Sequence, residues 1–265
     1  MVTTLSGIHR RGPARFAGLL LLAALAGPGA AAAAACPAGS LGTSRVMEVA
    51  PQGLRVGRKS FPETLPLAPK EVVLTFDDGP WPVTTAAILD ALKAECVRAT
   101  FFLIGQNAQA RPALVKRTLA EGHTIAHHSM THPAATLAKI SHAAAMKEIT
   151  DGIAADEKAA YGSAGAKPRV PFFRFPGFAS TPELLAELEK SGIGVFGADF
   201  WASDWNVMTP EKQLALVLER LEAAGGGIVL FHDTKDQTAK MIPDFLRALA
   251  TRGYKVVHMV PPGGG

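Results

Sequence analysis

The stretch "EVVLTFDDGP", residues 71–80, places an apolar run directly before two aspartates, a glycine and a proline. An unbroken apolar run of this length is typical of a parallel strand whose two faces are both covered. Asp-Gly and Gly-Pro are strong turn signals, so the strand is expected to end at Asp77 and Asp78. A turn alone does not explain two adjacent like charges at the end of a buried strand, where each opposes ionisation of the other.

Similar apolar runs recur along the chain and alternate with longer amphipathic segments. Six further strands are expected, at residues 99–105, 123–127, 170–175, 192–199, 226–233 and 254–259. Six helices are expected between them, at residues 84–95, 110–122, 140–162, 181–192, 209–226 and 238–253. Several of these begin with Thr or Ser followed by Pro or Glu and end with Gly, as helices do. Alternating strands and helices indicate an α/β fold of parallel βα units. About seven strands are close to a (β/α) barrel, and an open doubly wound sheet is the alternative.

The first 35 residues have a different character from the rest of the chain. A basic start is followed by the apolar run "FAGLLLLAALAG" and an alanine tract, which is typical of a secretory signal peptide. The apolar run is shorter than the ~20 residues of a membrane span, so a retained anchor is the lesser alternative. The protein is therefore expected to be exported to the periplasm, the cell surface or the medium. Residues 36–70 are expected to form an extended leader, and residues 71–260 the main domain.

The charge balance gives no support for nucleic-acid binding, and the cysteine content excludes a Cys-based metal site. The formal net charge is +4, and three of these charges are arginines of the signal region, which leaves +1 for the remainder. This balance gives no evidence for binding to nucleic acid. The only cysteines, Cys36 and Cys96, cannot form a Cys-based metal site. They could pair in an oxidising compartment, but Cys36 lies in the leader and Cys96 among apolar neighbours, so unpaired thiols are expected. Lipid attachment at Cys36 is a minor alternative.

Ionisable residues gather where the expected strands end. They are Asp77, Asp78, His127, His128, His132, Arg174, Asp199, Asp204, His232 and Asp233. Because chemistry in parallel α/β folds lies at the carboxyl ends of the strands, we expect one site there.

A pair of histidines in this set has the spacing of metal ligands. His128 and His132 are four apart, so in a helical turn they point the same way, and a carboxylate from the first strand could complete a three-ligand set. Three protein ligands are typical of a catalytic zinc site. Capping or core packing is the alternative for this pair. The rival pair His123 and His127 lies in a strand, where residues four apart are separated by ~13 Å.

The motifs "TFDDGP", "HHSMTHP", the arginine of "FFRFPGF", "SDW" and "LFH" resemble, in order and spacing, those of NodB-type polysaccharide deacetylases, carbohydrate esterase family 4. The resemblance extends from about residue 71 to about residue 258. It implies a distorted (β/α) barrel that removes acetyl groups, mostly from N-acetylated sugars of glycans such as chitin or peptidoglycan. It also implies one divalent metal ion, zinc first, with cobalt or nickel as alternatives.

The resemblance assigns the central roles residue by residue. Asp78, His128 and His132 would hold the metal ion. Asp77 would be the base that takes a proton from the attacking water, because a nearby dication offsets the repulsion between the two aspartates. His232 would be the acid that protonates the leaving amine, since a histidine pKa is easily moved across neutrality.

Supporting roles follow from the same resemblance. Arg174 would orient Asp77, Asp204 would keep His232 protonated, and Trp205 and Leu230 would form the walls of the acetyl pocket. Without the family, a lone Arg after a strand is as readily a surface ion-pair residue, and a Trp beside Asp is as readily part of the core.

The chain departs from the family pattern at two motifs. The family's arginine motif usually continues Pro, Pro, aromatic, Gly, and the amide of the aromatic helps to stabilise the oxyanion. Here Gly177 occupies that position and Phe178 follows it, so a backbone donor survives but the aromatic wall is displaced. The family's fourth motif often carries a second Asp, for which Asp199 is the nearest candidate. His127 stands where the family often has Asn and is a further candidate for the pocket.

Other functions remain as alternatives. An acetyl-ester esterase acting on xylan or a small cyclic-amide hydrolase would keep the same metal site. A catalytically silent glycan-binding domain would lack the base, the acid or the ligands. Asp233 and Asp236 are expected only to cap the following helix.

Overall fold

The computed structural model describes residues 1–4, 7 and 36–264. The expected signal peptide and its cleavage zone lie outside the described residues, apart from residues 1–4 and 7. The strands are β1 (Thr43–Glu48), β2 (Arg55–Val56), β3 (Glu71–Asp77), β4 (Thr100–Leu103), β5 (Thr124–His127), β6 (Phe172–Phe173), β7 (Gly194–Phe196), β8 (Phe200–Trp201), β9 (Gly227–His232) and β10 (Lys255–Val260). The helices are α1 (Thr84–Ala94), α2 (Gly105–Ala110), α3 (Pro112–Ala120), α4 (His142–Tyr161), α5 (Pro182–Lys190), α6 (Pro210–Ala224) and α7 (Asp236–Thr251), with 3-10 turns η1 (Leu137–Lys139) and η2 (Pro176–Phe178).

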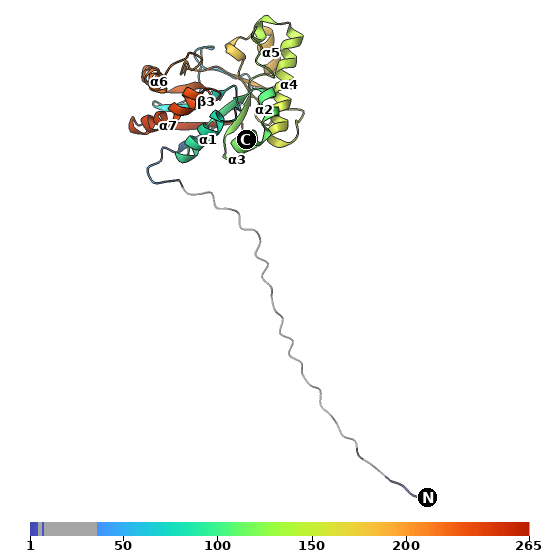
Figure 1. Cartoon of the computed structure of the whole chain (residues 1–265). Helices are drawn as coiled ribbons and strands as arrows, with labels where there is room; N and C mark the ends of the chain where they lie inside the picture. The colour runs from blue at the N-terminus through green and yellow to red at the C-terminus, as the bar shows by residue number, and fades with distance from the viewer. Residues whose placement is uncertain (5–6, 8–35, 265) are drawn as a thin grey trace. The chain divides into compact units, whose positions relative to one another are not determined.

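The strands form one parallel sheet in the order β1-β10-β3-β4-β5-β6-β7-β2. Strand β9 also pairs with β3, and β8 pairs with β9. Helices α1, α6 and α7 lie on one side of β3, and α2, α4 and α5 lie toward the other (Figure 1). The expected α/β fold of parallel strands is confirmed. Within residues 36–264, however, no pairing joins β8 to β7 or β2, so strand pairing alone does not close a ring.

The seven expected strands appear as β3, β4, β5, β6, β7, β9 and β10, and the six expected helices as α1, α3, α4, α5, α6 and α7. The start signals act as predicted, because the hydroxyls of Ser141, Thr181 and Thr209 accept hydrogen bonds from the first turns of α4, α5 and α6. Gly162 and Gly225 end α4 and α6 in the left-handed conformation.

Residues 36–70, expected as an extended leader, belong to the same compact unit as the main domain, Cys36–Gly265. Strand β1 pairs with β10, and β2 pairs with β7. The backbone at Gly57, with φ +107°, approaches Gly197 so closely that a Cβ would lie 2.4 Å from the Gly197 carbonyl carbon. The segment contributes apolar residues such as Val56 and Leu65 to the core. The sequence pattern did not predict this, because the strands of the segment are short and its charges are scattered.

The expectation of two unpaired thiols was wrong, because Cys36 and Cys96 form a disulfide. Their Cα atoms are 5.9 Å apart, a normal separation for this bond. Backbone N–H groups of Gly42 and Thr43 donate to the carbonyls of Glu95 and Cys96, so the segment before β1 is held beside the end of α1. The sequence separation of 60 residues gave no sign of this proximity.

Loss of the disulfide is expected to lower the free energy of unfolding by about 2–4 kcal/mol, because the bond restricts the unfolded chain across its long loop. Urea unfolding of the oxidised protein, with and without reductant, measures this difference. In the Cys36→Ser variant, reductant should have no further effect. Equal midpoints for oxidised and reduced protein would show that the bond contributes nothing to folding.

Alternation along β3 decides where its polar side chains point. Val72, Leu74 and Phe76 belong to the core cluster that includes α1 and α7 residues, whereas Val73 belongs to a second cluster, with Phe102, Phe172 and Phe196. Because side chains on a strand alternate between faces, Asp77 lies on the same face of the sheet as Val73.

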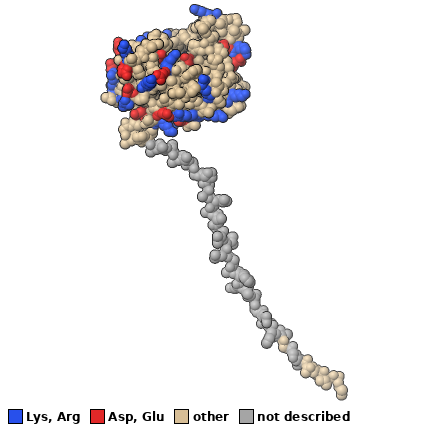
Figure 2. Space-filling model, in the orientation of Figure 1, with Lys and Arg blue, Asp and Glu red and all other residues tan. Residues whose placement is uncertain are grey.

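The surface carries charges of both signs. On the face shown in Figure 2, Lys and Arg side chains are interspersed with Asp and Glu rather than gathered into one field. No helix in the described part of the chain is both long and apolar enough to cross a bilayer.

Candidate active site

The carboxyl ends of the parallel strands surround a cavity of about 390 Å³. Its lining consists of Asp77, Asp78, His128, His132, Phe175, Gly177, Phe178, Trp201, Trp205, Leu230, His232 and Lys235. Nearly all of the site residues expected from the sequence therefore meet at one place. Of the residues that the resemblance gave metal-binding, catalytic or acetyl-pocket roles, Arg174 and Asp204 do not line the cavity but lie directly behind it.

Asp78, His128 and His132 are arranged as a ligand set for a metal ion. One ligand atom from each lies within 4.8 Å of the others. Oδ1 of Asp78 is 3.6 Å from Nε2 of His128 and 3.7 Å from Nε2 of His132. Ligands bonded to one tetrahedral zinc at its usual distances are about 3.4 Å apart. Oδ1 of Asp78 is also buried without a hydrogen-bond partner, which is costly unless a cation or a donor lies beside it. These residues fit a divalent ion.

The tautomer of His128 also suits a metal ligand. Its Nδ1 lies 2.7 Å from the carbonyl oxygen of Arg174. A carbonyl can only accept, so Nδ1 carries the proton and Nε2 keeps its lone pair toward Asp78. Burial lowers the pKa of His128 to about 3, so the imidazole is neutral at ordinary pH.

Arg174 holds Asp77 from inside the sheet. Both side chains are buried, and Nη1 donates to Oδ1 of Asp77 at 2.7 Å and to Oγ1 of Thr75 at 2.9 Å. Nη2 donates to the carbonyl oxygen of Gly197. The guanidinium lies 4.2 Å from the ring centroid of Phe102. Asp77 is thus fixed with Oδ2 turned toward His128, at 3.9 Å from Nε2.

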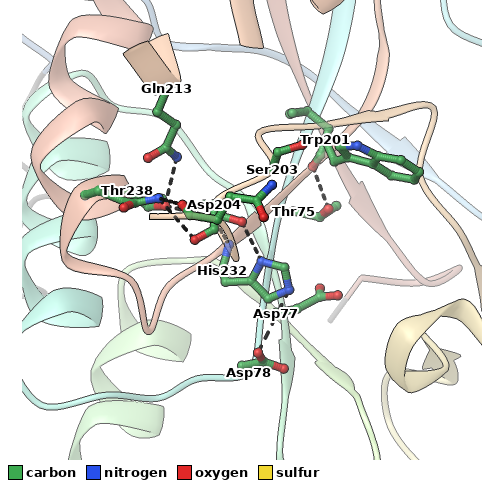
Figure 3. Close-up of polar contacts among 12 residues, drawn as sticks. Thr75, Asp77, Asp78, Trp201, Ser203, Asp204, Gln213, His232 and Thr238 are labelled. Carbon is green, nitrogen blue, oxygen red and sulfur yellow. Dashed lines mark hydrogen bonds and ion pairs between the residues drawn. The ribbon is translucent and has the colours of Figure 1, made fainter. Parts of the chain in front are cut away.

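His232 lies between Asp204 and Asp78 (Figure 3). Its Nδ1 is 2.7 Å from Oδ1 of Asp204, and its Nε2 is 3.9 Å from Oδ2 of Asp78. Oδ2 of Asp204 accepts from the backbone of His232 and from Thr238, whose hydroxyl accepts from Gln213. This chain of hydrogen bonds aims Nε2 of His232 at the cavity.

The environment shifts the pKa of the expected base and of the expected acid. Burial raises the pKa of Asp77 above its ordinary value, although the charges of Arg174 and His232 oppose that rise. Burial by itself lowers the pKa of His232. The hydrogen bond and charge of Asp204, with the charges of Asp78 and Asp77, outweigh it and raise that pKa to about 9.

One wall of the cavity is aromatic. Trp205, which is 49% exposed, has its ring 6.0 Å from the His232 ring and 5.7 Å from that of Trp201. Trp201 stacks on Phe178 at 6.1 Å. Trp201 was not among the site residues expected from the sequence, although its place four residues before Trp205, beyond a strand, was a usable signal.

The amide of Gly177 remains the backbone donor on this side of the cavity. The N–H of Phe178 donates to the carbonyl of Phe175, whereas within residues 36–264 that of Gly177 donates to no protein group. Gly177 has φ +60° and Phe178 φ +57°, so η2 is a tight turn at the cavity wall.

Four other residues singled out in the sequence lie outside the cavity lining: His127, Asp199, Asp233 and Asp236. His127 is buried and pairs with Asp156 at 2.9 Å. Asp199 accepts from the backbones of Arg58 and Ile228 and from Thr64, so it joins segments of the fold.

Asp233 does not cap α7, contrary to expectation. It is buried and accepts a hydrogen bond from Thr85 on α1, and α7 begins after Lys235 with no side-chain cap. Asp236 lies in the first turn of α7 rather than at its cap. The backbone of β9 carries Asp233 inward, against Gly79.

Comparison with known proteins identifies the family. The model of the polysaccharide deacetylase family matches residues 65–196. A chitooligosaccharide deacetylase of Bradyrhizobium sp. (strain ANU 289) is 31% identical over 206 residues, which cover 72% of this chain and 90% of that protein. The chain belongs to the polysaccharide deacetylase family. The resemblance of its motifs is confirmed, and the family and the matching relatives are polysaccharide deacetylases, which are hydrolases of amide bonds.

Two further relatives extend the match. A solved structure of a peptidoglycan deacetylase of Bdellovibrio bacteriovorus is similar to this chain, with a TM-score of 0.73 and 34% identity, and the match covers 84% of this chain and 60% of that chain. A peptidoglycan-N-acetylglucosamine deacetylase of Listeria monocytogenes is 32% identical over 190 residues, 71% of this chain and 38% of that protein. The chain therefore spans less than half of the Listeria protein.

Proposed function

We propose that this protein is an exported, metal-dependent hydrolase that removes acetyl groups from N-acetylated sugars of a glycan of the chitin or peptidoglycan type. The observation that carries the proposal is a complete set of base, acid and ligand residues around one cavity, with the base held by Arg174 and the acid by Asp204. The names of the relatives, chitooligosaccharide and peptidoglycan deacetylases, support the same substrate class.

The metal ion would be held by Asp78, His128 and His132, with zinc as the first choice because two neutral imidazoles and one carboxylate suit it. When bound, such an ion lowers the pKa of a water molecule and polarises the acetyl carbonyl.

Asp77 would take the proton from the attacking water. Oδ1 is engaged by Arg174, so Oδ2 is the oxygen that faces the cavity. The raised pKa of Asp77 strengthens its basicity, and Arg174 keeps the carboxylate from rotating. The N–H of Gly177 would donate to the oxyanion that develops on the carbonyl.

His232 would donate a proton from Nε2 to the nitrogen of the sugar, because an amide nitrogen leaves poorly as an anion. Asp204 keeps Nδ1 protonated and supports the imidazolium form, which is present below a pKa of about 9. Proton donation is therefore available at neutral pH.

The test is acetate release by the mature protein, with zinc or cobalt added, from chitin oligomers, peptidoglycan fragments and acetylated xylan. Release from the two N-acetylated glycans is expected, and metal analysis of the same sample identifies the ion. Acetate release from xylan alone would mean that the bond hydrolysed is an acetyl ester and not an amide. No release from any glycan would overturn the proposal. Export is tested by fractionating cells that express the full chain.

Replacing Asp204 by asparagine is expected to move the alkaline limb of the kcat/KM profile to lower pH. The acidic form of His232 is lost as pH rises through its pKa, and the substitution removes the carboxylate that raises that pKa. Activity at neutral pH should fall about 10²-fold or more, within the usual contribution of a general acid. The pH dependence of kcat/KM measures both effects.

Thr238→Val is the control for this prediction. It removes one hydrogen bond to Asp204 but leaves its charge, so the alkaline limb should move much less. An unchanged limb in Asp204→Asn would mean that His232 is not the group titrating there.

A further inference from the structure

Trp201 separates the candidate active site from a second hollow. One side of Trp201 lines the cavity that contains Asp77 and His232. The residue also lines a neighbouring hollow of about 370 Å³, which falls in the size range of small-ligand sites. A chain-like substrate that extends past Trp201 would therefore enter the second hollow.

Basic side chains surround Trp201 on this path. Lys59 and Arg220 line the second hollow, and Lys235 lines the catalytic cavity. The Nζ atom of Lys59 lies 5.3 Å from the ring centroid of Trp201. None of these three cations has a carboxylate within ion-pair distance in the described part of the chain.

Hydrogen bonds to the fold position the backbone of Lys59 and the guanidinium of Arg220. The backbone of Lys59 donates to the carbonyl of Ala198, just before β8. Nη1 of Arg220 donates to the carbonyl of Trp201 and to Ser203, both at 2.7 Å, which leaves the rest of its guanidinium for a ligand. The one acidic residue of the second hollow, Asp199, already accepts three hydrogen bonds from protein donors.

We infer that the second hollow is a subsite for an acidic substituent of the glycan, so that the preferred substrate carries a carboxylate on a sugar next to the one that is deacetylated. The inference rests on the proposed function and narrows its substrate class. A glycan that extends past the edge of Trp201 would bring such a carboxylate toward Lys59 and Arg220, where opposite charge speeds association and fixes register. A neutral glycan would leave these cations without an anionic partner.

The experiment uses one glycan in two charge states. Soluble peptidoglycan glycan strands, freed of their stem peptides by an amidase so that each muramic acid carries a free carboxylate, are compared with the same strands after carbodiimide coupling to methylamine, which turns each carboxylate into a neutral amide. For the unaltered protein, kcat/KM for acetate release is expected to fall about tenfold on neutralisation, as for a lost pair of charge contacts. Lys59→Gln is expected to reduce that ratio by about three- to tenfold, and Lys59→Glu to reduce it further. Lys116→Gln, the same change at an exposed lysine on α3, should leave the ratio unchanged.

Two outcomes overturn the inference: equal kcat/KM for both forms in the unaltered protein, or an undiminished ratio in both Lys59 variants. Failure of the proposed function looks different, because neither form would release acetate. Binding then decides the question, since quenching of tryptophan fluorescence by the acidic and neutralised strands can be titrated without turnover. Equal dissociation constants for the two forms would exclude the subsite in that case.

Discussion

Asp77→Asn is expected to lower kcat by about 10²–10⁴ while the protein still binds one divalent ion, because the change removes the general base and spares the ligand set. Asp77 and Asp78 are neighbours in sequence but face different groups. Asp77 is bound by Arg174 at 2.7 Å, whereas Oδ1 of Asp78 lies within 3.7 Å of Nε2 in both His128 and His132. Acetate release and metal content of the same purified variant measure the two effects together.

The matched control is Asp78→Asn, the same substitution one residue later. It is expected to lose the metal ion as well as activity, because the remaining ligands are two neutral imidazoles. If Asp77→Asn loses the ion and Asp78→Asn keeps it, the two aspartates have been assigned the wrong way round.

Arg174→Met is expected to lower the free energy of unfolding by about 3–5 kcal/mol, the largest stability effect among the changes considered. The substitution leaves the carboxylate of Asp77 buried without its counter-charge. It also removes the donors to Thr75 and to the Gly197 carbonyl, which then lack partners in the interior. Chemical denaturation of the variant beside the unaltered protein measures the loss.

Arg55→Met is the control for burial. Arg55 and Glu189 form an ion pair with the same 2.7 Å separation, but their side chains are 39% and 48% exposed. Water replaces such a partner readily, so a change within about 1 kcal/mol is expected. A loss for Arg174→Met no larger than this would mean that the buried pair contributes little.

The double variant Asp77→Asn/Arg174→Met separates the pair from its surroundings. Its cost should be clearly smaller than the sum of the two single costs, because each single change leaves one charge unpaired in the interior. Strict additivity would contradict a direct coupling between the two side chains.

Local sequence signals predicted most of the elements and the composition of the cavity. Apolar runs located seven strands, and Thr-Pro starts located α5 and α6, because strand and helix signals act over a few residues. The same signals failed in residues 36–70, where β1 and β2 are too short and too charged to show a period. They also missed β8, and with it Trp201, because the segment "ADFWASDW" was interpreted as the loop after β7.

The order of the motifs and the parallel βα pattern were enough to predict that the site residues lie at one end of the sheet, since the carboxyl ends of parallel strands meet there. Which residue touches which was decided by tertiary structure. Arg174 reaches Asp77 across a sequence separation of 97 residues, and Asp204 reaches His232 across 28. Both contacts depend on strand register and on the face to which each side chain turns. The same holds for Cys36 with Cys96 and for Lys59 beside Trp201, whose segments come together only when residues 36–70 pack against the sheet. The sequence by itself therefore determined which chemical groups lie at the site of this protein. The tertiary structure decided which partner sets the charge and the direction of each group, because burial and the distances between side chains are fixed only when the chain packs.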